Sequence, residues 1–396
     1  MKEKSESPAP TQNSPSKKSE SYSKLNNMMQ LIFFGVMALV LLLGHFLLWK
    51  FWLSFFNLTT TSSHVYAALI ILALFLSVIL ASYLIHKWDN LFTRWYYILT
   101  GFWIGLLANL FISIVVIYFL KLILPILNIS PAISVYRIIF VSIAVLLSLY
   151  GVYGARYSKI TEYTVFIKDL PESWNNKVVV QISDVHLGPV YRQYYFNRVM
   201  DKIAKINPEA VFITGDLFDG MEADFSWLGK PFDRINPPQG IFYSFGNHDL
   251  YLGLNRSKEI LKDRPVIILD DKMVEISGLQ IIGINYSFDK DFDLEKNILD
   301  QVGYDKKKPS ILLFHAPKNI DLASSAEIDL QLSGHTHDGQ MFPFNLLAKW
   351  SHKGHGYGFF NQGDFNLIVS RGVGTWGPPM RTSGSSEIVK IILKKK

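Results

Sequence analysis

Four long apolar runs, separated by short polar connections, occupy the first 156 residues. They cover residues 28–49, 65–85, 96–120 and 133–153. Each is long enough to cross a hydrocarbon core of about 30 Å, which takes roughly 20 helical residues. Buried helices of a soluble protein would keep a polar face, and the second run, VYAALIILALFLSVILASYLI, has none. A cleaved signal peptide does not explain the first run, because that run and its leader are too long and further runs follow. The pattern predicts a four-helix membrane anchor over residues 28–156.

The polar segment before the first run, residues 1–27, is rich in Ser, Pro, Lys and Glu and has almost no apolar content. Such a segment cannot bury enough apolar surface to fold, so we expect a disordered tail. On the side of this tail, its own lysines are joined by Lys87, Arg94, Arg156 and Lys159, whereas the opposite side has Lys50 and Lys121. Because Lys and Arg are enriched in cytoplasmic connections, we expect a multi-pass protein of the cell membrane with both termini, and the C-terminal domain, on the cytoplasmic side. An uneven number of spans would reverse this placement.

Short apolar runs that end in polar clusters replace this pattern from about Ser158. Five of them have the pattern of buried strands: 177–183, 210–215, 240–246, 311–316 and 328–334. Helical spacing appears at 195–207, and a second set of strands is indicated at 279–285, 366–370 and 387–393. Strands that alternate with helices predict an α/β sandwich for residues 157–396. In such folds the chemistry gathers at the carboxyl ends of the strands.

Composition narrows the class of protein. Hydrophobic residues make up 49% of the chain and charged residues 18%, too apolar for a purely soluble enzyme. The formal net charge of +6 is modest and comes largely from lysines near the membrane and at the C-terminus, so a nucleic-acid partner is not expected. The chain has no cysteine, which excludes a disulfide framework and thiolate metal sites.

Each of the five predicted strands ends in side chains that can bind a metal. In chain order these are Asp184 and His186, Asp216, Asn247, His315, and finally His335 and His337. Seven oxygen and imidazole donors exceed what one ion would take, and they fit two ions about 3.5–4 Å apart that share a carboxylate. Without thiolates the set suits Mn, with Fe or Zn as alternatives, better than Ca. Two such ions lower the pKa of a bridging water to give hydroxide and neutralise a phosphoryl group under in-line attack.

The order of these blocks, D-x-H, G-D-x-x-D, G-N-H-D, a lone His and G-H-x-H, resembles that of the calcineurin-like metallophosphoesterases over residues 175 to 395. The closing SRGVGTWGPPMR, residues 370–381, is similar to that of the membrane-associated branch. The resemblance implies a four-layer αββα sandwich with a dimetal centre at the loop ends. It also implies two ligand sets: Asp184, His186, Asp216 and His337 for one ion, and Asp216, Asn247, His315 and His335 for the other.

Further roles follow from the same resemblance. His248 resembles the general acid that protonates the leaving oxygen, oriented by Asp249. Asp219, the last residue of G-D-x-x-D, is expected to brace its loop rather than bind metal. Asp338 stands where the family more often has Gly, and we expect its carboxylate to face solvent.

Arg371 and Arg381 are candidate substrate-binding residues. An arginine near a phosphoryl site forms bidentate hydrogen bonds to phosphate, although arginines also cap turns. The apolar segments 189–196 and 341–350 follow two of the metal blocks, where they fit either an acyl-binding wall or ordinary core packing.

The resulting hypothesis is a membrane-anchored dimetal phosphoesterase. A lipid phosphoester or lipid-linked pyrophosphate is the leading substrate, and a soluble phosphodiester or a phosphoprotein is the alternative. Two alternative hypotheses are a catalytically silent metal-binding interaction module and a nuclease. Monoester, diester and pyrophosphate substrates, several metals and any oligomeric state all fit the sequence.

Overall fold

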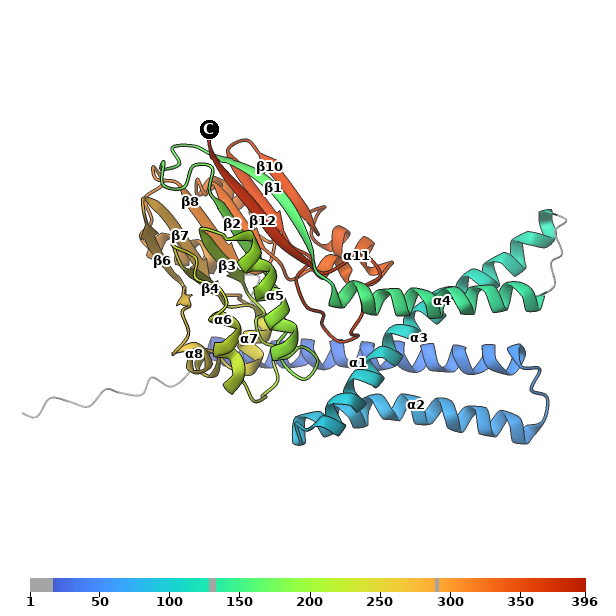
Figure 1. Cartoon of the computed structure of the whole chain (residues 1–396). Coiled ribbons are helices and arrows are strands. Elements are labelled where there is room, and N and C mark those ends of the chain that lie inside the picture. Colours follow the sequence, from blue (N-terminus) through green and yellow to red (C-terminus); the bar gives the residue numbers. More distant parts are fainter. Residues whose placement is uncertain (1–16, 128–132, 289–291) are drawn as a thin grey trace, which may run out of the picture. The chain divides into compact units, whose positions relative to one another are not determined.

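The computed structural model describes residues 17–127, 133–288 and 292–396 (Figure 1). The chain forms two compact units, Met1–Phe75 and Leu76–Lys396. Helix α1 (Lys17–Phe55) and the first part of α2 (Thr61–Lys87) belong to the first unit. Since α1 begins at Lys17, residues 17–27 are helical rather than disordered as predicted, and residues 1–16 of that tail lie outside the described residues. Extending an existing helix adds one hydrogen bond for each residue fixed, which explains how a polar segment continues an apolar helix.

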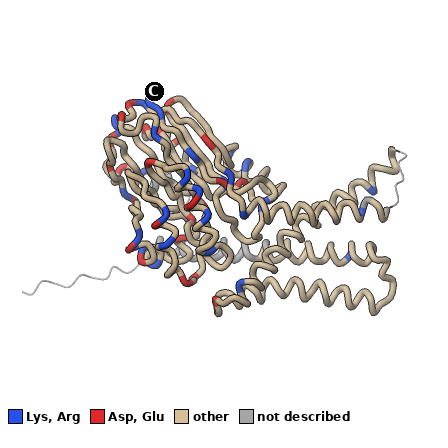
Figure 2. Tube along the Cα trace, viewed as in Figure 1, with Lys and Arg blue, Asp and Glu red and all other residues tan. Residues whose placement is uncertain are grey.

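The described part of the chain contains four helices long and apolar enough to cross a membrane. Their apolar stretches are Ala38–Phe55, Thr61–Lys87, Leu91–Leu127 and Arg137–Arg156. Charged residues are sparse along these helices and frequent in the rest of the chain (Figure 2). The predicted membrane region is confirmed by these helices.

The last two membrane helices, α3 (Leu91–Ile123) and α4 (Ile133–Arg156), belong to the same compact unit as the sheets. Helix α3 starts where the Asn90 side chain accepts hydrogen bonds from the backbone N–H groups of Phe92 and Thr93, and it ends in the short helix η1 (Leu124–Leu127). The division between the two compact units falls within α2, after Phe75.

Two six-stranded mixed sheets form the described C-terminal region. The first has the order β1 (Lys159–Ile167), β12 (Glu387–Lys395), β2 (Val178–Ile182), β3 (Ala210–Thr214), β4 (Ile241–Ser244), β5 (Ile267–Ile268). The second has the order β10 (Gly358–Gln362), β11 (Phe365–Val369), β9 (Leu330–Ser333), β8 (Ser310–Phe314), β7 (Leu279–Ile284), β6 (Lys272–Ile276). Strands β2 to β5 are parallel, as are β7, β8, β9 and β11. The predicted strands are all present, and those not predicted (β1, β5, β6 and β10) lie at or near sheet edges.

Three apolar clusters bind the layers together. One lies between the sheets and includes Phe212, Phe242 and Leu313. Another packs the outer face of the first sheet against helices α5 (Gln193–Ile206), α6 (Gly229–Phe232) and α8 (Leu254–Leu261). The third packs the second sheet against α9 (Phe292–Gln301) and α10 (Ile320–Ser325). The predicted four-layer αββα sandwich is confirmed.

The carboxyl ends of the central parallel strands of both sheets lie at one end of the sandwich. A side chain joins the sheets there: Gln181 Nε2 of β2 donates to the Ser333 carbonyl of β9 at 2.8 Å. The loops that follow β2, β3, β4, β8 and β9 consequently converge, as strand ends do in open α/β sheets. The short elements η2 (Ser226–Leu228), α7 (Asn247–Leu252), η3 (His337–Gly339) and α11 (Phe344–Ser351) complete the described chain.

Candidate functional site

The seven predicted metal ligands come together at these converging loops. Six are buried, and His335 is half-buried. Each follows the end of its own strand: Asp184 and His186 follow β2, Asp216 follows β3, Asn247 follows β4, His315 follows β8, and His335 and His337 follow β9. Segments more than a hundred residues apart in sequence thus supply one centre.

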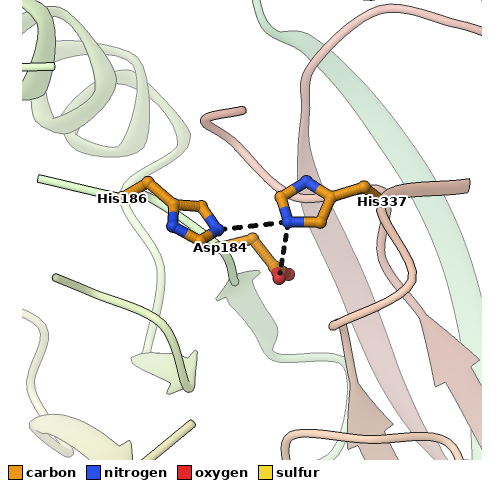
Figure 3. Close-up of side chains that lie close together, drawn as sticks. All are labelled: Asp184, His186 and His337. Carbon is orange, nitrogen blue, oxygen red and sulfur yellow. Dashed lines mark hydrogen bonds and ion pairs between the residues drawn. The ribbon is translucent and has the colours of Figure 1, made fainter. Parts of the chain in front are cut away.

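One group of possible ligands consists of Asp184, His186 and His337, whose ligand atoms lie within 4.8 Å of one another (Figure 3). Nε2 of His337 is 3.1 Å from Nε2 of His186 and 3.3 Å from Oδ1 of Asp184. Two imidazole nitrogens and a carboxylate oxygen pointing at one spot form a mixed N/O donor set of the kind that holds Mn, Fe or Zn.

A second group consists of Asp216, His315 and His335. Nε2 of His315 lies 3.0 Å from Oδ2 of Asp216, while Nδ1 of His315 is 2.8 Å from the Thr214 carbonyl, which fixes the ring. Within the described residues, Oδ1 of Asn247 is buried and has no hydrogen-bond partner. Buried polar atoms are rarely left unpaired. This unpaired oxygen fits a centre that is completed by a metal ion.

The backbone at the centre is held in an unusual conformation. Five of the predicted ligands, Asp184, His186, Asp216, His335 and His337, have φ between 51° and 69°. Side chains other than Gly rarely adopt this left-handed region, and each instance costs on the order of 1 kcal/mol or more. Such strain persists where the surrounding structure imposes it, typically at functional sites.

Asp249 does not orient His248, contrary to prediction. Its fully buried carboxylate accepts from the backbone N–H groups of Asp216 at 2.8 Å, Gly246 at 2.7 Å and Phe218 at 3.0 Å. A carboxylate with two oxygens satisfies several converging N–H groups at once, so Asp249 fixes the loops after β3 and β4 against each other.

His248 is oriented by the backbone of Asp219. Nδ1 of His248 lies 3.0 Å from the Asp219 carbonyl, so this nitrogen donates and Nε2 is left for other contacts. Its ring centroid is 4.7 Å from that of His186. The Trp376 and Tyr251 rings, at 5.8 Å and 5.2 Å, flank it. Sequence reasoning missed both aromatics, although Trp376 lies in the closing SRGVGTWGPPMR segment.

The Asp219 side chain faces the metal ligands from outside. Its Oδ1 is 3.2 Å from Nδ1 of His186, the ring nitrogen that points away from Asp184 and His337. A carboxylate on the distal nitrogen of a ligating histidine fixes its tautomer and makes it more basic. This position agrees with the prediction that Asp219 braces the site.

Asp338 faces Arg371, not solvent as predicted. Its Oδ2 accepts from Nε of Arg371 at 2.9 Å, and the Arg371 guanidinium lies 3.7 Å from the centre of the Tyr357 ring. The carboxylate in place of the usual Gly therefore has a local partner, and Arg371 has part of its hydrogen-bonding capacity in use.

Arg381 is 1% exposed and lies under the centre rather than in its opening. Its guanidinium donates to the carbonyls of Gly374 at 2.6 Å, Arg371 at 2.6 Å and His337 at 3.0 Å, and also contacts Nδ1 of His337 at 3.0 Å. These buried contacts disagree with the prediction that Arg381 binds substrate, because its donors are occupied by the protein. Arg381 instead orients His337 through the His337 backbone carbonyl, because a His337 whose Nε2 binds metal keeps a proton on Nδ1 and cannot accept from a guanidinium.

The membrane helices α3 and α4 reach the segment that contains Arg381. The backbone N–H of Arg381 donates to the Gly151 carbonyl at 2.8 Å. Met380, fully buried, packs against Gly105, where a Cβ would come 2.5 Å from its Sδ and Cε atoms. Near the end of α4, the Gly154 carbonyl accepts from Ser386 N–H at 2.9 Å. Glycines on both helices thus admit the closing segment, which connects the helices to His337 through a single residue.

The two histidines of the second group differ in their pKa values. Burial and the neighbouring His315 lower the pKa of His335 to about 3, so at neutral pH its imidazole is uncharged. Burial also opposes the charged form of His315, but the Asp216 carboxylate outweighs it and raises the pKa of His315 to about 9. Metal ligation requires neutral imidazole, so occupation of this group would release the His315 proton.

Comparisons with known proteins agree with this geometry. The family model of the calcineurin-like phosphoesterases matches residues 177–339. An uncharacterized metallophosphoesterase of Aquifex aeolicus is 34% identical over 262 residues, which cover 64% of this chain and 98% of that protein. Another, of Campylobacter jejuni, is 31% identical over 325 residues, covering 80% and 86%. A transmembrane protein with a metallophosphoesterase domain from Danio rerio is 30% identical over 276 residues, covering 64% of this chain and 61% of that protein. With its apolar helices, the chain belongs to the calcineurin-like metallophosphoesterases as a membrane-associated member.

Proposed function

We propose that this metallophosphoesterase hydrolyses its phosphoester with two divalent ions, most simply Mn²⁺. Asp184, His186, Asp216 and His337 would hold one ion, and Asp216, Asn247, His315 and His335 the other. This assignment is carried by the clustering of two ligand groups, Asp184–His186–His337 and Asp216–His315–His335, at one set of strand ends. The unpaired buried Oδ1 of Asn247 supports it. When bound, such ions activate water as the nucleophile and neutralise charge on the phosphoryl group.

His248 is the residue we assign to leaving-group protonation. Its Nδ1 is held by the Asp219 carbonyl, so Nε2 is the atom that would donate the proton. Burial and the adjacent His186 lower the pKa of His248 below its usual value, which leaves the free ring mostly neutral at pH 7. A bound phosphate anion raises that pKa, because a nearby negative charge favours the imidazolium. The His248 imidazole would therefore be protonated mainly when substrate is bound.

We further propose that the substrate is a lipid phosphoester or lipid-linked pyrophosphate, that Arg371 contacts it, and that residues 157–396 form a catalytic domain on the cytoplasmic side. The apolar helices and the segment 341–350 beside the site support a membrane substrate. Part of the Arg371 side chain, 25% exposed, remains accessible from solvent.

The test is hydrolysis by the purified full-length chain in detergent with Mn²⁺. Bis-p-nitrophenyl phosphate, a phosphomonoester and a lipid pyrophosphate would be compared, using Asn247→Ala and His248→Ala as inactive variants. Asn361→Ala, at an exposed position in β10, is the matched control. Mn²⁺-dependent activity that both site variants lose and the control keeps supports the proposal. Metal binding without hydrolysis of any substrate would instead favour an interaction module.

A further inference from the structure

Helix α11 leaves its apolar side chains exposed. The helix has no buried residue, and large apolar side chains on it and just before it are open: Phe342 48%, Phe344 49%, Leu346 59%, Leu347 56% and Trp350 79%. Trp350 lies four residues after Leu346 and three after Leu347, so it is a neighbour of both on one face of the helix. A surface helix of a soluble domain normally turns such a face into the core.

Contacts place this exposed segment at the level of the last turns of a membrane helix. The Phe342 N–H donates to Oγ1 of Thr382 at 3.0 Å. The methyl group of Thr382 in turn packs on Gly151 of α4, 3.0 Å from where a Cβ would stand. From Gly151 to the end of α4 at Arg156 is about 7.5 Å of helix. This contact therefore lies close to the end of the apolar stretch Arg137–Arg156. Figure 1 shows α11 beside this end of α4.

A second contact fixes the same boundary on the other side of the site. Asp89 lies in the connection between α2 and α3, and its carboxylate pairs with Arg94 at the start of α3 and with Nη1 of Arg192 at 3.4 Å. Arg192 belongs to the loop just after the β2 metal block. Two connections of the membrane region thus hold the strand-end side of the sandwich, where the ligands lie, towards the membrane.

The charge of α11 also suits a lipid surface. Residues 341–353, MFPFNLLAKWSHK, contain Lys349 and Lys353 and no acidic residue, and both lysines are exposed. Exposed aromatic and aliphatic side chains with lysines beside them are the composition of helices that lie in the membrane interface. Basic residues near the surface of an anionic membrane are attracted to its lipids.

We propose that α11, with Phe342, inserts its Leu346–Leu347–Trp350 face into the bilayer boundary and holds the His335–His337 turn at headgroup level. The chain runs from His337 to α11 within a few residues. Gln340, between them, exchanges two hydrogen bonds with the Trp376 backbone, at 2.9 and 3.0 Å. Trp376, 48% exposed, extends the apolar surface up to His248. Resting on the proposed function, this arrangement gives the substrate class: a phosphoester in the headgroup of a lipid that stays in the bilayer.

The absence of cysteine allows a direct test of docking that does not depend on activity. Leu347→Cys would carry an environment-sensitive fluorophore in the full-length chain, reconstituted in phosphatidylethanolamine and phosphatidylglycerol vesicles. Phe166→Cys is the matched control, because Phe166 is 52% exposed and lies about 23 Å along β1 from the membrane end of the domain. We expect lipids with a nitroxide near the headgroup to quench the label at 347 several-fold more than the label at 166, and aqueous iodide to do the reverse. Equal behaviour of the two labels would overturn the docking proposal. Protection of 347 from both quenchers would also overturn it, since another protein surface would then cover the helix.

Hydrolysis assays on a lipid and on a soluble substrate distinguish the membrane docking of α11 from the proposed lipid substrate. In the double variant Leu346→Ser, Leu347→Ser, hydrolysis of a lipid pyrophosphate in vesicles should fall about tenfold, since two exposed leucines leave the interface. Hydrolysis of soluble bis-p-nitrophenyl phosphate should not change. An equal loss on both substrates would indicate a purely structural role for α11. Activity on the soluble ester alone, with the label at 347 quenched by lipid, would keep the docking and overturn the lipid substrate. Inactivity on every substrate would count against the proposed function without affecting the label result.

Discussion

Replacement of Arg381 by lysine should weaken metal binding without touching a ligand. Arginine presents five N–H donors in a planar fork, whereas lysine has three donors on one nitrogen. In the structure Nη1 donates to the His337 carbonyl, Nη2 to the carbonyls of Arg371 and Gly374, and Nε to that of Gly374. A lysine ammonium offers one nitrogen in place of three, so it cannot keep all these contacts, and His337 loses its position or a buried carbonyl loses its partner.

The expected size follows from these contacts. An unpaired buried acceptor costs about 1–3 kcal/mol, and the loss of a partner that orients a ligating histidine lowers metal affinity about 10–100-fold. In free energy that fold-change is about 1.4–2.8 kcal/mol. Arg381→Lys should therefore show a raised Kd for Mn²⁺ at one of two sites and a moderately lower Tm.

Calorimetric titration of Mn²⁺ into the full-length chain measures this, with circular dichroism to establish that the variant is folded. Arg256→Lys is the control, since the Arg256 side chain is 40% exposed and pairs with Glu222 and Glu259, away from the metal ligands. A folded Arg381→Lys variant that binds Mn²⁺ with unchanged affinity would refute the assignment of Arg381 as the residue that orients His337.

Three further predictions concern a helix contact, the general acid and a remote carboxylate. Gly154→Ala puts a Cβ 3.2 Å from the Arg381 carbonyl oxygen and should cost about 1–3 kcal/mol of stability and reduce kcat. Gly35→Ala, whose Cβ meets no neighbouring group within 4 Å among the described residues, should change neither quantity in thermal melts and rate assays. His248→Gln should lower kcat by about 10²–10⁴-fold with unchanged Mn²⁺ affinity, and a parallel loss of metal in calorimetry would contradict a proton-transfer role. Burial, with Asp364 and Asp169 nearby, raises the pKa of Asp329 to about 6. The free energy of unfolding therefore falls as pH rises from about 4 to 6, and it remains at the lower value above pH 6. Asp329→Asn should remove this loss. After a discount for the partial exposure of the carboxyl group, the variant should gain about 1 kcal/mol of stability over wild type at pH 8 relative to pH 4. A difference in Tm between variant and wild type that does not depend on pH would contradict this.

Much of the fold is predictable from the sequence because its strongest signals are local. Apolar runs specify the membrane helices, and a buried strand such as β3 is recognisable as a short apolar segment before a turn. The partly exposed β6, KMVEI, is not predicted, because its five residues form neither a continuous apolar run nor a strict alternation. The start of α1 at Lys17 also escaped prediction, since a polar segment carries no periodic signal of its own.

The sequence predicts which residues belong to the site better than it predicts where each side chain points. The order of the motifs brings the predicted ligands together, but it does not tell which atom faces which. Asp249 follows His248 directly, yet its carboxylate turns to the backbone of the neighbouring loop. Arg381 has the chemistry of a phosphate ligand, and only its 1% exposure identifies it as an internal support.

The backbone hydrogen bonds from the closing segment to α4 limit how this protein can be shortened. A chain that starts after residue 156 would lose the Gly151 and Gly154 carbonyls, which accept from Arg381 and Ser386. Met380, now wholly enclosed, would become exposed to water. The enzyme is therefore not a soluble domain on a replaceable tether: its last membrane helices are part of the folding unit, and solubilised preparations should retain them if they are to bind metal.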